Sequence, residues 1–231
     1  MSQIVILAGG KATRLYPATK DTSKSMIKIN GIPFISHQIN LLKRNNISNV
    51  ILCIGVFSDQ IIDYVGDGSK FGVSVKYSIE NSTELLGTLG ALIKAYDLLS
   101  DVFFVTFGDS YLEIDYQRIY EEFLHSNKMG LMTVFKNNNK FVSSNTTIKN
   151  GMVTRYDKSN STNFEYVDYG LSIFKKKVLD FFPKKKNLDL TELNQKLISL
   201  KELVAYEVDQ KFYEIGTFEG ITDLESHLKN N

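Results

Sequence analysis

The sequence contains no tryptophan, only three prolines and a single cysteine. Because Cys53 is alone and lies inside the apolar run VILCIGV, the chain can form neither an internal disulfide nor a cysteine-based zinc site. No apolar stretch reaches the roughly 18 residues of a membrane-spanning helix, and the N-terminus lacks the positive region of a signal peptide. We therefore expect a soluble, cytoplasmic protein with no membrane partner.

The chain also lacks an excess of either charge. Its 27 lysines and arginines are balanced by 26 aspartates and glutamates, so no long-range field would attract nucleic acid. Hydrophobic residues make up 43% of the 231 positions, which is enough for a large core and excludes a disordered chain. We expect one folded domain over residues 1–231.

Strand and helix patterns alternate through the first half of the chain. Apolar runs predict strands at residues 4–8, 49–56, 73–79, 102–107 and 130–135, and apolar residues at helical spacing predict helices at residues 32–46, 59–65, 88–99 and 116–125. This alternation predicts an α/β fold with a Rossmann-like, mixed, mainly parallel sheet wrapped by helices.

The pattern changes after Lys136. An Asn150-Gly151 pair between two β-rich runs predicts a hairpin, and therefore a small β-hairpin lobe. Beyond it we expect strands at residues 166–174 and 203–208 and helices at residues 175–182, 189–200 and 217–228, the last with Thr217 as its N-cap.

A glycine pair follows the first predicted strand in the stretch LAGGKATRL. Ligands of open α/β sheets bind beyond the carboxyl ends of the strands, where Gly9 and Gly10 would let backbone N–H groups approach a phosphate. Arg14, one of only four arginines, suits a forked contact with phosphate oxygens. GxGxxG does not fit, because Ala12 and Thr13 occupy its later positions, and Ala12 also removes the hydroxyl of a P-loop. A plain turn in a solvated basic loop stays open as the alternative.

The segment LAGGKATRLYPATKDTSKSMIKINGIPFISHQ resembles the signature of the sugar-1-phosphate nucleotidyltransferases, the NDP-sugar pyrophosphorylases. Short, single-domain bacterial members similar to heptose-1-phosphate guanylyltransferases are the most alike, and the similarity runs from residue 3 to about residue 225. The resemblance implies an enzyme that makes an NDP-sugar and pyrophosphate from an NTP and a sugar 1-phosphate, with Mg²⁺ as cofactor. Residues 1–135 would be the nucleotide-binding part, and residues 136–231 the sugar-phosphate-binding part that also supplies a second metal ligand.

The same resemblance implies roles for individual residues. The catalytic groups would be Arg14 on the β and γ phosphates, Lys24 at the α-phosphate, and Asp109 of FGDSY, which shares the metal with Glu214 of FYEIGT. The stretches LAGGK and ENSTELLGTLGAL would bind the nucleotide, and VTRYDKSN and VDYGLSIF the sugar phosphate. The implied nucleotide-binding residues are Leu7, Ala8, Gly9, Gly10, Lys11, Arg14, Glu80, Gly87 and Thr88, and the implied substrate-binding residues are Asp157, Lys158, Asp168 and Gly170.

Two other functions stay open at this point. A cytidylyltransferase for a small phospho-alcohol, such as phosphocholine or glycerol phosphate, would share the fold, and so would a non-catalytic nucleotide sensor. A phosphocholine cage would have to be built from the 12 tyrosines and 15 phenylalanines. The sequence does not fix the base, for which GTP or CTP is our guess, nor the choice between heptose and hexose, and it leaves a homo-oligomer open. The three histidines and Cys53 are interpreted as structural.

Overall fold

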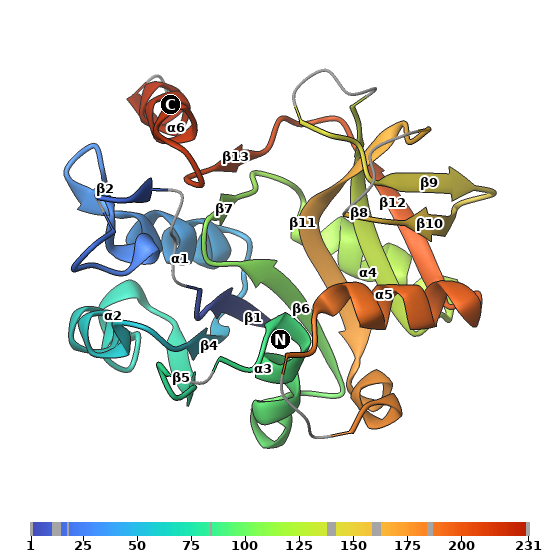
Figure 1. Cartoon of the computed structure of the whole chain (residues 1–231), viewed down its shortest axis with the longest axis horizontal. Coiled ribbons are helices and arrows are strands. Elements are labelled where there is room, and N and C mark those ends of the chain that lie inside the picture. Colours follow the sequence, from blue (N-terminus) through green and yellow to red (C-terminus); the bar gives the residue numbers. More distant parts are fainter. Residues whose placement is uncertain are drawn as a thin grey trace.

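The computed structural model describes residues 2–10, 15–17, 19–83, 85–137, 142–158, 163–183 and 187–229. A nine-stranded sheet passes through both halves of the chain, with helices on its two faces (Figure 1). From one edge to the other its strands are β5 (Ser74–Ile79), β4 (Asn49–Ile54), β1 (Gln3–Ala8), β6 (Val102–Phe107), β11 (Tyr166–Lys175), β8 (Gly130–Lys136), β12 (Leu203–Val208), β10 (Met152–Tyr156) and β9 (Thr146–Lys149). The predicted α/β fold with a mixed, helix-wrapped sheet is confirmed.

The first four strands of the sheet are parallel. β1 lies between β4 and β6, and Leu7 pairs with Cys53 on one side and Phe107 on the other. Side chains of β1 alternate between the two apolar cores, so that Ile4 and Ile6 enter one while Val5 and Leu7 enter the other. This double burial explains the continuous apolar run in the sequence. It also places the carboxyl ends of β1 and β6 side by side.

The remaining strands are mostly antiparallel. β11 runs antiparallel to β6 and β8, whereas β12 is parallel to β8. The predicted hairpin is confirmed as β9 and β10, and its turn residues Asn150 and Gly151 both have positive φ, as a tight primed turn requires. The hairpin continues the large sheet through β12.

Six α-helices are described, and four of them agree closely with the sequence prediction. The six are α1 (Phe34–Arg44), α2 (Ser58–Val65), α3 (Thr88–Lys94), α4 (Tyr116–Ser126), α5 (Leu190–Ser199) and α6 (Phe218–Lys229), and the described residues also form 3₁₀ turns at Lys24–Met26, Ser69–Phe71, Tyr96–Leu98 and Lys176–Phe181. α2, α4, α5 and α6 start and end within one residue of their predicted bounds. The predicted cap of α6 is confirmed, because the Thr217 hydroxyl accepts a hydrogen bond from the N–H of Gly220.

Three predicted helices were wrong in extent. Residues 32 and 33 belong to a strand, β3 (Ile32–Pro33), which pairs with β2 (Lys28–Ile29) across a turn in which Asn30 and Gly31 have positive φ. The helix predicted at residues 88–99 ends at Lys94, before a 3₁₀ turn. The helix predicted at residues 175–182 is a 3₁₀ turn, because β11 still pairs with β6 at Lys175.

No helix among the described residues is long and apolar enough to span a membrane.

A third, smaller core lies outside the large sheet. It joins α1 and the β2–β3 turn to the chain's last helix, through Ile29, Phe34, Leu41, Tyr111, Ile215 and Leu224. Figure 1 shows this last helix, α6, beside β2 and next to β13 (Tyr213–Glu214), far from β12. The end of the chain therefore packs on its beginning.

The two halves also meet where α3 begins. Leu188 donates its N–H to the carbonyl of Leu86 at 3.1 Å and accepts from the N–H of Leu89 at 3.0 Å. Gly87 lies between these contacts with φ +79°, and a Cβ at this position would be 2.4 Å from the Leu188 carbonyl oxygen. Only glycine fits here, because both its backbone conformation and the space around it exclude a side chain.

We therefore expect Gly87→Ala to destabilise the fold more than Gly31→Ala. Both positions have a similar positive φ, but a Cβ on Gly31 would meet nothing within 4 Å. Gly31→Ala should lower the free energy of unfolding by about 1–2 kcal/mol from backbone strain alone, and Gly87→Ala by more than about 3 kcal/mol because the clash is added. Urea denaturation of the two variants measures the difference. Equal losses would contradict the proposed contact with Leu188.

Candidate functional site

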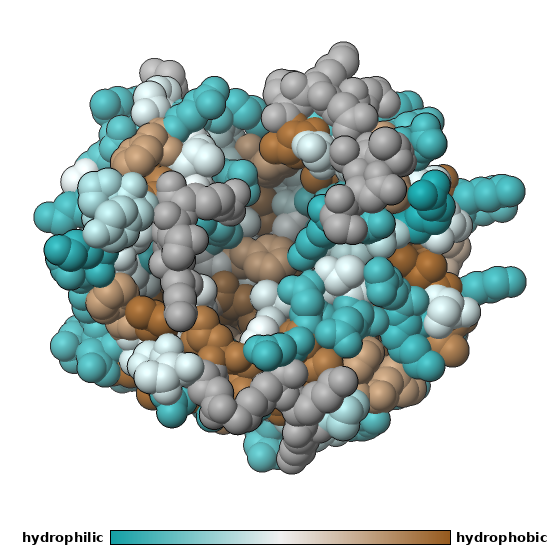
Figure 2. All heavy atoms as spheres, in the orientation of Figure 1, coloured by the Kyte–Doolittle hydropathy of each residue, from teal (hydrophilic) through white to brown (hydrophobic). Residues whose placement is uncertain are grey.

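A cavity of about 360 Å³ opens beyond the carboxyl ends of β1 and β6. Figure 2 shows the hollow near the middle of this face, with hydrophobic residues on its floor. Ligands of open α/β sheets bind at this position. Nine of the residues that the sequence assigns to the site line the cavity, namely Leu7, Ala8, Gly9, Gly10, Lys24, Glu80, Gly87, Thr88 and Asp109.

Two predicted nucleotide contacts, Lys11 and Arg14, lie outside the described residues. Their roles remain predictions. Gly9 and Gly10, which precede them in the sequence, line the cavity.

An ion pair faces the cavity. Asp109 lies two residues after the end of β6. Its Oδ2 lies 2.5 Å from Nζ of Lys24 in the 3₁₀ turn Lys24–Met26. The two side chains are 23% and 15% exposed, so neither is withdrawn into the core. Ser25, next to Lys24, donates its hydroxyl to the carbonyl of Gly108 at 3.0 Å. The turn that carries the cation is thereby fastened to the turn that carries the carboxylate.

Gly108 allows this close approach. A Cβ on Gly108 would lie 2.6 Å from Cβ of Ala8 and 3.1 Å from the Ser25 hydroxyl. Its N–H donates to the carbonyl of Leu7 at 2.9 Å. A glycine before Asp109 therefore lets the end of β6 pack directly on the end of β1.

The second predicted acid, Glu214, lies in a small two-stranded sheet whose other strand follows Asp109. β13 (Tyr213–Glu214) pairs antiparallel with β7 (Ser110–Tyr111), with Glu214 opposite Ser110. The next residue, Ile215, donates its N–H to the Asp109 carbonyl at 2.9 Å. The backbone of Glu214 is therefore one position from Asp109, although Gly216 and not Glu214 lines the cavity. The described residues contain no ready group of three or more His, Cys, Asp or Glu side chains around one point.

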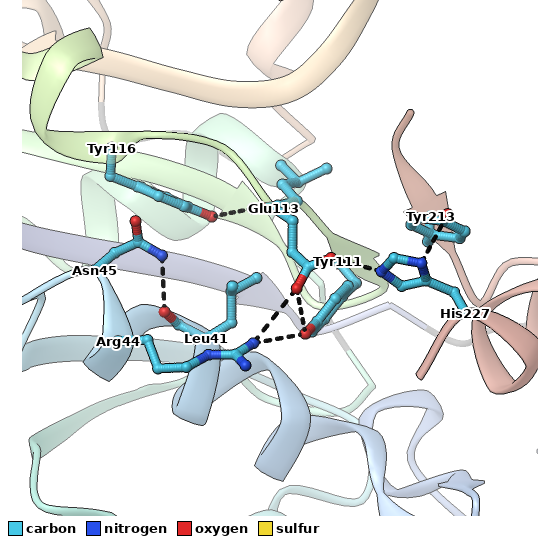
Figure 3. Close-up of polar contacts among 9 residues, drawn as sticks. Leu41, Arg44, Asn45, Tyr111, Glu113, Tyr116, Tyr213 and His227 are labelled. Atoms are coloured by element: carbon cyan, nitrogen blue, oxygen red, sulfur yellow. Dashed lines mark hydrogen bonds and ion pairs between the residues drawn. The ribbon is translucent and has the colours of Figure 1, made fainter. Parts of the chain in front are cut away.

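A polar cluster fastens this small sheet to α6 (Figure 3). His227 of α6 contacts Glu113 through Nε2 at 2.5 Å and the Tyr213 hydroxyl through Nδ1 at 3.1 Å, and its ring stacks on Tyr213. On the far side, Arg44 donates to the Tyr111 hydroxyl at 2.9 Å. His227 thus has structural contacts, as the sequence analysis expected. They hold β13 against β7 from outside the cavity.

The opposite wall of the cavity carries a buried carboxylate. Oε2 of Glu80 accepts a hydrogen bond from the N–H of Leu86 at 2.8 Å. Burial raises the pKa of Glu80, and this hydrogen bond and the charge of Lys94 oppose that rise. Burial, together with the charge of Glu80, raises the pKa of the neighbouring Cys53 to about 12, so its thiol stays protonated. Glu80 fixes the loop that leads to Gly87.

Gly9 packs tightly on this carboxylate. A Cβ on Gly9 would lie 3.3 Å from Oε1 of Glu80. The glycine after β1 therefore leaves room for Glu80 beside the cavity, whereas Gly10 faces open space.

The predicted phosphate ligand Lys158 does not line the cavity but lies near Phe107, which does. Its Nζ is 3.8 Å from a carboxylate oxygen of Asp189 and 5.7 Å from the ring centre of Phe107, which lines the cavity. Asp189 in turn accepts a hydrogen bond from the hydroxyl of Thr88 at 3.0 Å. This chain of contacts connects Lys158 with the nucleotide side of the cavity. Asp157 precedes it, and its N–H donates to the Asn145 carbonyl.

Asp168 and Gly170 lie at an irregularity in β11. Asp168 accepts from the N–H of Gly170 and from the hydroxyl of Tyr156, each at 3.0 Å. Gly170 has φ +98°, and a Cβ there would be 3.5 Å from the Ser110 hydroxyl. Burial raises the pKa of Asp168, and the charge of Lys158 opposes the rise. The irregularity therefore turns this part of β11 toward the strand that follows Asp109.

Sequence reasoning missed several residues of this region. Ser25, Phe107 and Gly108 line the cavity beside predicted residues, and Asp189 joins Lys158 to Thr88. Gly108 and Ser25 are direct neighbours of Asp109 and Lys24 in the sequence, which would have been enough to find them. Asp189 had no such neighbour, since its contact with Thr88 spans 101 positions.

The chain is similar to known proteins over nearly its whole length. The family described as "Nucleotidyl transferase" matches residues 3–231. UTP–glucose-1-phosphate uridylyltransferase of Synechocystis is 27% identical over 92% of this chain and 59% of its own length. D-glycero-alpha-D-manno-heptose 1-phosphate guanylyltransferase of Campylobacter jejuni is 36% identical over 51% of this chain and 52% of its own length. The chain thus spans between about half and three fifths of these curated relatives.

A solved structure agrees over the whole fold. HddC from Yersinia pseudotuberculosis has a TM-score of 0.82 and 25% identity, and the match covers 99% of this chain and 100% of that one. HddC has also been solved complexed with GMP-PN.

The raised pKa of Asp168 predicts a pH-dependent cost to folding. A carboxyl with a raised folded pKa stabilises the fold while it is protonated, and this contribution is lost as the pH rises from its ordinary pKa of 3.8 through the folded value. Asp168→Asn removes the effect. Its free energy of unfolding relative to the unsubstituted protein should therefore increase as the pH rises above about 4.

Asp67 supplies the matched control. Hydrogen bonds from Ser69 lower the pKa of this exposed carboxyl, so the relative stability of Asp67→Asn should fall as the pH rises toward the ordinary pKa of 3.8 and should stay flat above about pH 5, where that of Asp168→Asn rises. Chemical denaturation at several pH values gives both curves. A relative stability of Asp168→Asn that is flat or falls with pH would exclude the desolvated carboxylate.

Proposed function

The chain belongs to the nucleotidyl transferase family, and from this we propose that it is a sugar-1-phosphate nucleotidyltransferase, which forms an NDP-sugar and pyrophosphate from an NTP and a sugar 1-phosphate. One observation carries the proposal: the ion pair of Lys24 and Asp109 faces a cavity that the glycine pair after β1 also lines. A cationic side chain, a hard carboxylate and backbone N–H groups are the groups that phosphoryl chemistry needs.

The reaction needs no general base. The phosphate oxygen of the acceptor is already anionic, so it attacks the α-phosphorus directly, and the bond from that phosphorus to the β-phosphate oxygen breaks in line. The protein has to position two anions and neutralise the charge that builds between them. Lys24 would do so at the α-phosphate, and Lys11 and Arg14 along the rest of the triphosphate. The residues described around the cavity include no histidine, which agrees with this chemistry.

The carboxylates suit a divalent cation. Oxygens of Asp109 are hard donors at the cavity surface, and the pairing of β13 with β7 brings the backbone of Glu214 one position away. We propose these two residues as ligands of Mg²⁺, which when bound would offset charge on the phosphate oxygens. Lys24 shares Asp109 with that site, so the cation and the carboxylate are positioned together.

The two sides of the cavity suit different parts of the substrates. The nucleoside would contact Glu80, Gly87 and Thr88, because these residues line the cavity wall on the Gly9 side. Lys158 would bind the acceptor phosphate, and Asp157, Asp168 and Gly170 the sugar. A lysine and a carboxylate in these positions favour a polyhydroxylated phosphate over phosphocholine, which would require an aromatic cage.

We propose a guanine nucleotide as the first to test. A relative of this chain is named a guanylyltransferase, and HddC has been solved with GMP-PN. CTP is the second choice, and heptose and hexose 1-phosphates are the acceptors to compare. We place the reaction in the cytoplasm, where NTPs are available and the lone Cys53 stays reduced.

A substrate panel tests the proposal. The purified chain is incubated with each of four NTPs and with heptose, hexose and alcohol phosphates, and pyrophosphate is measured. We expect release only when an NTP and a sugar 1-phosphate are both present with Mg²⁺. Release with an alcohol phosphate in place of a sugar would favour the cytidylyltransferase alternative, and no release from any pair would contradict an enzymatic role.

Removing either member of the ion pair should nearly abolish turnover. We expect Asp109→Asn and Lys24→Ala each to lower kcat by about 10²–10³-fold, because each removes charge stabilisation at the reacting phosphates. The melting temperature should change little. The control is the 3.6 Å ion pair of Lys128, which follows α4, with Glu202, which precedes β12; Lys128→Ala should leave kcat within about twofold. Near-normal rates in both cavity variants would remove these roles.

A further inference from the structure

A buried glutamine contacts both ends of the turn that presents Asp109. Gln38 lies on α1 and is 2% exposed. Its Nε2 donates to the carbonyls of Phe107 and Ser110, at 2.8 Å each. These two carbonyls flank Gly108 and Asp109.

We propose that Gln38 is a positioning residue that holds the Asp109 carboxylate in the geometry required for metal and phosphate binding. The proposal rests on the proposed function, since only there does Asp109 act on substrates. Gln38 does not touch the cavity. It acts through the backbone of the turn, as an outer partner that orients a ligand.

The other contacts of this turn show what Gln38 adds. The N–H of Gly108 donates a hydrogen bond to the carbonyl of Leu7, and the carbonyl of Gly108 accepts one from the Ser25 hydroxyl. The carbonyl of Asp109 accepts a hydrogen bond from the N–H of Ile215. Each of these contacts fixes one point. Among the described residues, Gln38 is the one side chain that bridges the two sides of the turn, and it comes from the helix that packs on β7.

A glutamine at this buried position has an energetic cost, and this cost indicates that the N–H donors of its side chain have a role. Oε1 of Gln38 is buried and has no hydrogen-bond partner among the described residues, and such a group is unfavourable. A leucine or methionine would fill the same space without this cost. An amide NH₂ is needed, however, to donate two hydrogen bonds from one atom.

The chain offers a matched control. Asn194 on α5 is 1% exposed, and its two side-chain polar atoms also lack partners among the described residues. Asn194 is likewise a buried amide on a helix, but no hydrogen bond among the described residues connects it with the Asp109 turn. Asn194→Leu therefore reports what the loss of a buried amide does to the fold alone.

The experiment compares Gln38→Leu, Gln38→Glu and Asn194→Leu in the full chain. Four quantities are measured: kcat, KM for the NTP, the affinity for Mn²⁺ by electron paramagnetic resonance in the presence of the NTP, and the melting temperature. We expect Gln38→Leu to lower kcat and to weaken Mn²⁺ binding by about 10–100-fold each. KM for the NTP should change less than about threefold, because the base side of the cavity is untouched. Asn194→Leu should leave all three binding and rate values unchanged.

Gln38→Glu keeps the volume and changes only the donor. Its ionised carboxylate would face two carbonyl oxygens, whereas the protonated acid regains one donor. We expect its kcat, relative to that of the unsubstituted protein, to rise as the pH is lowered, and Gln38→Leu to show no such recovery. If Gln38→Leu does not fold, this pH profile and the Mn²⁺ affinity of Gln38→Glu decide the question.

Two results would overturn the proposal. One is unchanged Mn²⁺ affinity and kcat in the Gln38 variants, and the other is an equal loss in Asn194→Leu, which would indicate general destabilisation. Failure of the proposed function is separate, because it would appear as no pyrophosphate release by the unsubstituted protein with any substrate pair.

Discussion

The site depends on the ion pair between Lys24 and Asp109. It joins a loop that precedes α1 to the turn that follows β6, and it does so where the parallel strands β1 and β6 end together. In this position both charges face the cavity and remain available to a ligand. The Ser25 hydroxyl links the turn of Lys24 to the turn of Asp109, and Gln38 bridges the two ends of the Asp109 turn. Without these hydrogen bonds, the two loops would not keep the charged side chains in a fixed geometry.

The second half of the chain completes the site from three directions. β13 returns beside β7 and is held there by α6, whose His227 contacts both Glu113 and Tyr213. The irregular part of β11 turns Gly170 toward Ser110, and Lys158 lies near Phe107 and next to Asp189. These contacts bring parts of the second half of the chain beside the turn of Asp109 and beside Phe107 of the cavity.

Local patterns predicted much of this arrangement. The apolar run before Gly9, the Asn150-Gly151 turn and the Thr217 cap each depend on neighbouring residues, and the structure contains all three. Asn30-Gly31 carried the same hairpin signal, but the helical spacing after Pro33 obscured it. Gln38 could not be found in this way, because its partners lie 69 and 72 positions away and an amide within an amphipathic helix looks unremarkable. The direction of the Glu214 side chain depends on a two-residue strand that no periodicity reveals.

The central claim is that Asp109, beside the strand of Glu214, holds a divalent ion next to the phosphates of an NTP. Anomalous diffraction from crystals soaked with Mn²⁺ and a non-hydrolysable NTP tests it most directly. The account predicts a peak within about 2.5 Å of an Asp109 carboxylate oxygen, with phosphate oxygens of the nucleotide around the same ion. A nucleotide bound in the cavity with its ion elsewhere, and with Asp109 still paired only to Lys24, would contradict it.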